Sequence, residues 1–181
     1  LLIIFSMRNL IKFFIAVIII FSTFSSYSKD LNLPKNLVIY DKPKEYKDVF
    51  FKNRLNEETN LIKYEGKLLL MNFWATWCEP CKEEMPSLDK LAVDQNFQNL
   101  KILPVNIGQE KTNKIEEFYD KTKIKNLEIF YDTDVRLAKK FLLRGVPTTL
   151  IVDKDGKEFA RVVGSIDFQD ESFKTWLQAF D

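Results

Sequence analysis

The two cysteines of the chain, Cys78 and Cys81, are its only ones, and two residues separate them. An apolar run at residues 67–73 precedes them and predicts a buried strand, whereas apolar residues at helical spacing follow them and predict an amphipathic helix. The pair is therefore expected where a strand ends and a helix begins. The free amides and the positive end of a helix favour a thiolate on the first cysteine at such a junction.

Three other interpretations of the cysteine pair were compared with redox chemistry. A zinc site needs four protein ligands, or three and a water, and the chain has no histidine and no further cysteine to complete one. A purely structural disulfide across so short a loop removes little entropy from the unfolded chain. Two buried structural thiols remain an alternative, although Glu79 and Pro80 do not suit a continuous core face. Redox chemistry is favoured, with no metal and no cofactor.

The composition limits the other classes of function. A hydrophobic content of 46% is ample for a core, and a net charge of +1 gives no electrostatic case for nucleic acid as a partner. The absence of histidine removes the usual general base and the usual copper or iron ligand. Any acid–base chemistry must therefore fall to carboxylates or to the thiols themselves.

Residues 1–28 resemble a targeting segment rather than part of the fold. Arg8 and Lys12 form a positive start, residues 13–21 form an apolar run, and Ser26-Tyr27-Ser28 offers small residues at the cleavage-defining positions. The run is shorter than the roughly 20 apolar residues of a spanning helix. A cleaved export signal is therefore favoured over a retained membrane anchor. Either one predicts that the rest of the chain faces an oxidising, periplasmic compartment.

Residues 29–181 are expected to form one domain. Apolar runs of strand type alternate with helical patterns, and Asp155-Gly156 predicts a hairpin turn near the end. Strands are expected at residues 37–40, 49–51, 67–73, 100–107, 127–131, 150–153 and 159–163, and helices after the cysteines and at residues 111–123, 135–143 and 168–180. This alternation predicts an α/β sandwich with a mixed sheet.

Two motifs carry a resemblance to a known family. FWATWCEPCKEEMP at residues 73–86 and GVPTT at residues 145–149 resemble the thioredoxin fold. More closely, they resemble the exported TlpA/ResA-type thiol–disulfide reductases, which are related to the cytochrome c maturation thioredoxins. The resemblance covers residues 34–181. It implies a central mixed β-sheet flanked by helices, with an N-terminal extension and a central helical insert at residues 111–123.

The resemblance also implies roles for individual residues. With the residue patterns, it gives Cys78, Cys81 and Glu84 in catalysis and Trp77, Val146 and Pro147 in substrate binding. Glu79 and Pro80 are expected to tune the redox pair, Glu79 because its carboxylate beside the Cys78 thiolate opposes the stabilisation from the helix end. Pro147 matches the family's cis-proline. Glu84 also follows from the sequence itself, because it lies three residues after Cys81 and so shares a helix face with it.

Two positions depart from the thioredoxin pattern. Asn72 stands where thioredoxin has a buried aspartate, and Pro104 aligns with the lysine that accompanies that aspartate. An asparagine cannot ionise, so the proton of the buried cysteine must be handled elsewhere. Glu84 is the expected acceptor.

The expected function is that of an exported thiol–disulfide oxidoreductase that reduces disulfides in exported client proteins. Apocytochrome c cysteines are the first expected client, and a membrane thiol donor is the expected source of electrons, as the resemblance implies. The alternative is a non-catalytic Cu(I)-binding or metal-delivery module built on the CxxC pair. A thiol peroxidase is less favoured, because its PxxxTxxC pattern is absent.

Overall fold

The computed structural model describes residues 31–132 and 134–181. The predicted export signal or anchor at residues 1–28 lies outside this part of the chain. Within the described residues, no helix is both long enough and apolar enough to cross a membrane. Residues 32–181 form one unit.

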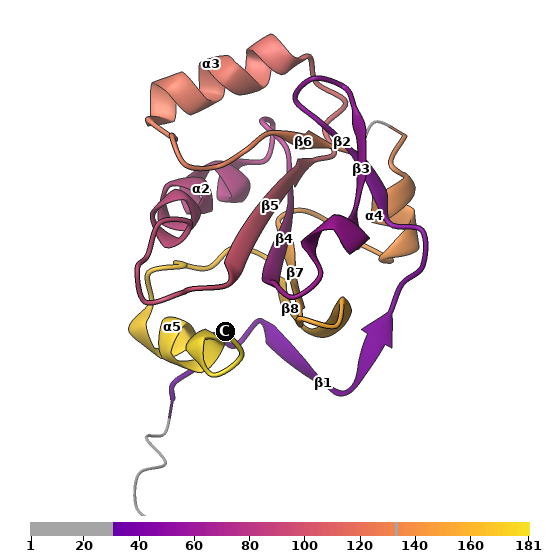
Figure 1. Ribbon diagram of the computed structural model, residues 1–181. Coiled ribbons are helices and arrows are strands. Elements are labelled where there is room, and N and C mark those ends of the chain that lie inside the picture. Colours follow the sequence, from indigo (N-terminus) through magenta and orange to yellow (C-terminus); the bar gives the residue numbers. More distant parts are fainter. Residues whose placement is uncertain (1–30, 133) are drawn as a thin grey trace, which may run out of the picture. The chain divides into compact units, whose positions relative to one another are not determined.

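A mixed sheet lies at the centre of this unit (Figure 1). In the described part of the chain its order is β1-β8-β7-β4-β5-β6-β2-β3. The strands are β1 (Leu37–Glu45), β2 (Phe50–Asn53), β3 (Glu58–Asn60), β4 (Leu68–Trp74), β5 (Leu100–Asn106), β6 (Phe130–Tyr131), β7 (Thr148–Val152) and β8 (Lys157–Val163). The helices are η1 (Leu61–Tyr64), α2 (Glu79–Leu91), α3 (Thr112–Thr122), α4 (Arg136–Lys140) and α5 (Glu171–Gln178). Strand β4 runs parallel to β5 and antiparallel to β7.

The central strand β4 is buried on both faces. None of its residues is more than 1% exposed, which explains the nearly continuous apolar run in the sequence. Leu68, Leu70 and Trp74 pack with α2, α3 and α5, whereas the alternate residues pack with η1 and α4 on the other face (Figure 1). Asn72 is the one residue of β4 with an amide side chain, and it lies on the face of α2.

The N-terminal extension adds strands at both edges of the sheet. Strand β1 pairs antiparallel with β8, and β2 and β3 extend the opposite edge through β6. The expected insert is present as α3. The expectations for the N-terminal strands were correct in place, but β1 is longer than predicted because it pairs along β8 with a bulge.

Two elements between α3 and β7 are shorter than the sequence predicts. The strand expected at residues 127–131 is reduced to Phe130–Tyr131. The backbone N–H groups of Lys125, Asn126 and Leu127 donate instead to the buried carboxylate of Asp89. A side chain on α2 therefore holds the segment that leads into the strand, and it takes the first donor of the expected strand, the N–H of Leu127. The helix expected at residues 135–143 is likewise only Arg136–Lys140.

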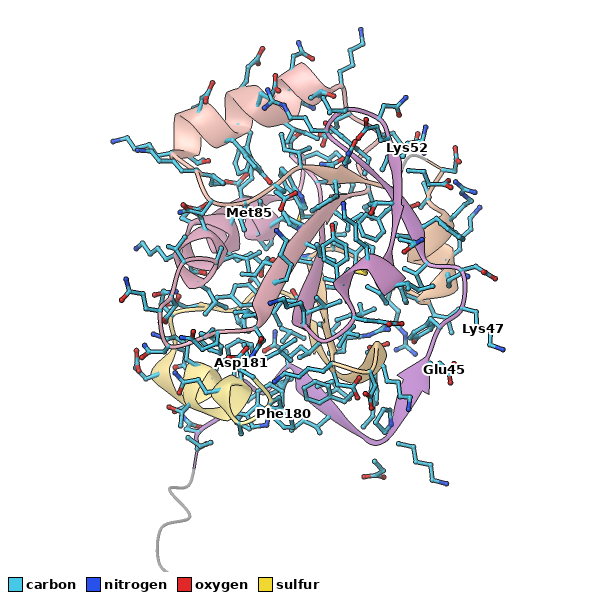
Figure 2. The ribbon with its side chains drawn as sticks, in the orientation of Figure 1. Glu45, Lys47, Lys52, Met85, Phe180 and Asp181 are labelled. Atoms are coloured by element: carbon cyan, nitrogen blue, oxygen red, sulfur yellow. A yellow bond between two sulfur atoms is a disulfide. The ribbon has the colours of Figure 1, made fainter. Side chains whose placement is uncertain are left out.

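The closing helix α5 begins at Glu171 rather than at Phe168. The Asp170 side chain accepts the N–H of Phe173 at 2.8 Å and so caps the helix. Phe180 was expected to point inward but is 40% exposed, although its ring lies 4.5 Å from that of Phe159. Figure 2 marks Phe180 and Asp181 at the end of this helix and Met85 on α2.

Candidate active site

The cysteine pair lies at the junction that the sequence predicts. Strand β4 ends at Trp74 and helix α2 begins at Glu79, with Cys78 as its N-cap residue. Cys78 and Cys81 form a disulfide with an S–S distance of 2.05 Å, and the N–H of Cys81 donates to the Cys78 sulfur at 3.3 Å. Cys78 is 5% exposed and Cys81 is fully buried. Cys78 is therefore the cysteine that a reactant can reach, although it is more enclosed than an open loop residue.

Val146 and Pro147 lie beside the end of β4 from which the chain continues to Cys78. The bond between them is cis, as the resemblance implied. Strand β7 begins just after Pro147, and its Thr148 pairs with Phe73 of β4. Since β4 and β7 are antiparallel, the loop that precedes Cys78 and the loop that contains Pro147 leave the sheet together.

The remaining expected surface residues flank the disulfide. Trp77, next to Cys78, is 63% exposed and presents a large apolar surface. Glu79 and Pro80 occupy the exposed first turn of α2. Glu79 forms an ion pair with Lys82, three residues further along the helix.

The ion pair changes what is expected of Glu79. A carboxylate near the Cys78 thiolate raises the pKa of the thiol, but Lys82 and solvent screening oppose this effect. We expect Glu79→Gln to lower the Cys78 pKa by less than about one pH unit. The pH dependence of iodoacetamide alkylation measures it. Lys82→Gln, the matched control, should raise the same pKa, and a titration unchanged in both variants would contradict this interpretation.

Glu84 is buried on the same helix as the cysteines. It is 2% exposed, and its carboxylate accepts hydrogen bonds from Asn72 Nδ2 at 2.8 Å and from the N–H of Ile166 at 3.4 Å. Burial raises the pKa of Glu84 to about 8, although these two hydrogen bonds partly oppose the shift. A carboxylate with this pKa can accept and release a proton near neutral pH.

The raised pKa of Glu84 has a consequence for stability. Between its ordinary value of 4.5 and about 8, folded Glu84 holds a proton that the unfolded chain releases. The free energy of unfolding should therefore fall by about 1.4 kcal/mol per pH unit as the pH rises through this window. Glu84→Gln stays neutral and should remove this slope in urea unfolding of the oxidised protein. The exposed Glu83→Gln should keep it, and equal slopes in the parent and Glu84→Gln would contradict the prediction.

The sequence presented Asn72 only as a departure from thioredoxin and gave no role to Thr149. In the structure, Asn72 Nδ2 also donates to Thr149 Oγ1 at 2.9 Å. Both residues are at most 1% exposed, so this contact is part of the buried surroundings of Glu84. The position of Thr149 in the GVPTT motif was the available signal.

Glu110 is a second residue that the sequence did not single out. Its carboxylate accepts the N–H of Thr76 at 3.0 Å, the Thr76 hydroxyl, and Asn106 Nδ2 at 2.8 Å, and it pairs with Lys114 at 3.2 Å. Burial alone would raise the pKa of Glu110, but these hydrogen bonds hold it below its ordinary value. The carboxylate therefore ties the loop before Cys78 to the start of α3. No spacing in the sequence indicates such a contact.

The described part of the chain contains no cluster of side chains that could bind a metal ion. Over residues 31–132 and 134–181 there is no group of three or more acidic, cysteine or histidine side chains placed to hold an ion.

Comparisons with known proteins agree with the geometry. A family model described as the AhpC/TSA family matches residues 44–157, more than half of the chain. The thiol-disulfide oxidoreductase ResA of Geobacillus thermodenitrificans is 34% identical over 113 residues, which are 62% of this chain and 64% of the relative. The protein of the same name from Bacillus subtilis is 31% identical over 119 residues, or 63% of this chain and 65% of the relative. The chain thus spans less than two thirds of the length of either relative.

The solved structures give the same fold. The crystal structure of a DsbF homologue from Corynebacterium diphtheriae aligns with a TM-score of 0.65 at 20% identity, and the alignment covers 78% of this chain and 93% of that one. The fold is thioredoxin-like, and the resemblance to ResA-type proteins is confirmed.

Proposed function

The chain belongs to the AhpC/TSA family, and from its cysteine pair and its relatives we propose that it is a thiol–disulfide oxidoreductase of the ResA type. One observation carries this proposal. The two cysteines form a disulfide at the N-terminus of α2, and the cis bond between Val146 and Pro147 lies at the same end of the central strands β4 and β7. Relatives named thiol-disulfide oxidoreductase support the same activity.

The proposed reaction begins with the reduced pair. The Cys78 thiolate attacks one sulfur of the client disulfide, the client S–S bond breaks, and the other client sulfur leaves as a thiolate. Cys81 then transfers its proton to Glu84 and attacks the Cys78 sulfur. The Cys78–Cys81 disulfide forms and the second client sulfur leaves as a thiolate, so the client gains two electrons. Its two thiolates take up two protons from solvent, which receives one proton when Cys78 ionises and one when Glu84 releases the proton of Cys81.

Glu84 fits the proton-transfer step for three reasons. It lies one helical turn from Cys81, and both side chains are buried. Burial disfavours the thiolate of Cys81, so a base must remove the proton for the second attack. With a pKa of about 8, Glu84 is partly ionised near neutral pH, and the ionised form, which grows as the pH rises, is the base.

The clients and the compartment complete the proposal. We place the protein in the periplasm, where it would reduce disulfides in exported proteins, with the cysteines of apocytochrome c as the first candidate clients. Trp77, Val146 and Pro147 would contact the client, and electrons would come from a membrane thiol donor. The predicted export signal or anchor at residues 1–28 and the names of the ResA relatives support this proposal.

The two rival functions are less well supported. A thiol peroxidase of the PxxxTxxC pattern would need proline and threonine at positions that Met71 and Ala75 occupy. A Cu(I) module would use the same two sulfurs as a clamp, but without any histidine to add a ligand.

Reduction of insulin disulfides by dithiothreitol tests the proposal. The parent protein should accelerate precipitation of the insulin B chain, and the Cys78→Ala variant should not. Titration of the reduced protein with Cu(I) is the companion measurement. Tight stoichiometric copper binding without any acceleration of insulin reduction would favour the metal-delivery module instead.

A further inference from the structure

Asn72 is a fully buried amide in the middle of the apolar strand β4. Such a group is costly to bury unless it forms hydrogen bonds. Its Nδ2 uses both N–H groups, one toward Glu84 Oε1 at 2.8 Å and one toward Thr149 Oγ1 at 2.9 Å. Its Oδ1 has no hydrogen-bond partner among the described residues. The two N–H groups of the amide, and not its oxygen, therefore make its hydrogen bonds in this site.

The strand register explains why the three residues meet. Thr149 pairs directly with Asn72 between the antiparallel strands β7 and β4, so their side chains share one face of the sheet. Helix α2 covers that face and contributes Glu84. The contact with Thr149 holds the amide plane, because one N–H is fixed on β7 while the other points at the carboxylate.

No charge competes with this contact. The Glu84 carboxylate accepts hydrogen bonds from Asn72 of β4 and from the N–H of Ile166 in the segment before α5, and Cys81 lies one helical turn away on α2. No salt bridge of the described residues includes Glu84. The hydrogen bond from the Asn72 amide, at 2.8 Å, is shorter than the one from the N–H of Ile166, at 3.4 Å, and is the shortest made to this carboxylate among the described residues.

We propose that Asn72 is a positioning residue for proton transfer: its amide, held by Thr149, orients the carboxylate of Glu84 and stabilises its ionised form, so that Glu84 takes the proton of Cys81. This inference rests on the proposed function. A neutral donor suits the task because it favours the carboxylate without adding a second negative charge beside it, as an aspartate would. The network also connects the proton acceptor to β7, the strand that follows the cis Val146–Pro147 bond.

The test measures Glu84 directly and through the reaction. In the oxidised protein, a carboxyl-carbon NMR titration gives the midpoint of Glu84 without any turnover. In the reduced protein, a small aromatic disulfide that releases a coloured thiolate gives two phases in stopped flow. The first phase is attack by Cys78, and the second is attack by Cys81 on the mixed disulfide.

Asn72→Val removes both donors and keeps a strand-forming residue of similar size. It should raise both the Glu84 midpoint and the pH midpoint of the second phase by about one pH unit or more. Thr149→Val should shift both midpoints in the same direction by a smaller amount. Thr149→Ser keeps the hydroxyl and should restore the parent values, which separates hydrogen bonding from packing even if Asn72→Val folds poorly.

Each outcome decides the question. Parallel upward shifts in the valine variants, with parent values in Thr149→Ser, support the proposal. An unchanged Glu84 midpoint in Thr149→Val and Asn72→Val would overturn it, as would a shifted midpoint with an unchanged second phase. Failure of the oxidoreductase function itself would appear differently, as the loss of both phases in the parent protein.

Discussion

A Cys81→Ala variant is expected to accumulate a covalent complex with an oxidised client, whereas Cys78→Ala is expected to form none. Cys78 is the cysteine at the N-terminus of α2 that retains some exposure, and Cys81 lies fully buried behind it. The helix end favours the thiolate of Cys78 and therefore its attack on the client. Without Cys81, the mixed disulfide has no intramolecular nucleophile to resolve it.

Mass spectrometry after incubation with oxidised insulin, under non-reducing conditions, measures the complex. The control is the double variant Cys78→Ala with Cys81→Ala, which should show no adduct. Each single variant lacks one sulfur atom of the parent, so their yields of covalent complex can be compared directly. Equal trapping by both single variants would contradict the assignment of Cys78 as the attacking residue.

Glu84→Gln is expected to slow resolution of the mixed disulfide by about 10²- to 10⁴-fold, the range for loss of a general base. Glutamine has nearly the same shape and can still accept the hydrogen bond of Asn72, but it cannot take a proton. The first attack by Cys78 does not involve this residue and should keep its rate. Stopped-flow measurement of the two phases separates the two steps.

Glu83→Gln is the matched control for this prediction. Glu83 precedes Glu84 on α2 but is exposed, so its substitution should leave both phases as in the parent. Thermal unfolding of both variants checks that the fold is kept. If Glu84→Gln and Glu83→Gln have the same resolution rate, Glu84 is a helix residue with no part in proton transfer.

Much of this site could be predicted because it depends on local patterns. The apolar run before Cys78 and the helical spacing after Cys81 predicted β4 and α2, since a strand buried on both faces and an amphipathic helix leave clear periodicities. The place of Glu84 followed from helix geometry alone. The cis bond before Pro147 came from the family resemblance, because its Val-Pro sequence by itself predicts only a turn.

The remaining features depend on contacts between residues far apart in the chain. Glu110 binds the loop at Thr76, and Thr149 binds Asn72, through hydrogen bonds that only the folded sheet brings together. At the start of the strand expected at residues 127–131, the N–H of Leu127 donates to Asp89, on another element, rather than to a neighbouring strand. Spacing within one segment carries no information about such partners.

The reduction potential of the Cys78–Cys81 pair tests the central claim most directly. A protein-disulfide reductase should show a two-electron couple near that of thioredoxin, about −270 mV, when equilibrated with glutathione or dithiothreitol buffers. The exposed Glu79 favours this result, since a carboxylate near the pair disfavours the Cys78 thiolate that would stabilise the reduced form. A value near about −120 mV would mean a disulfide oxidant and would contradict the proposed direction of electron flow.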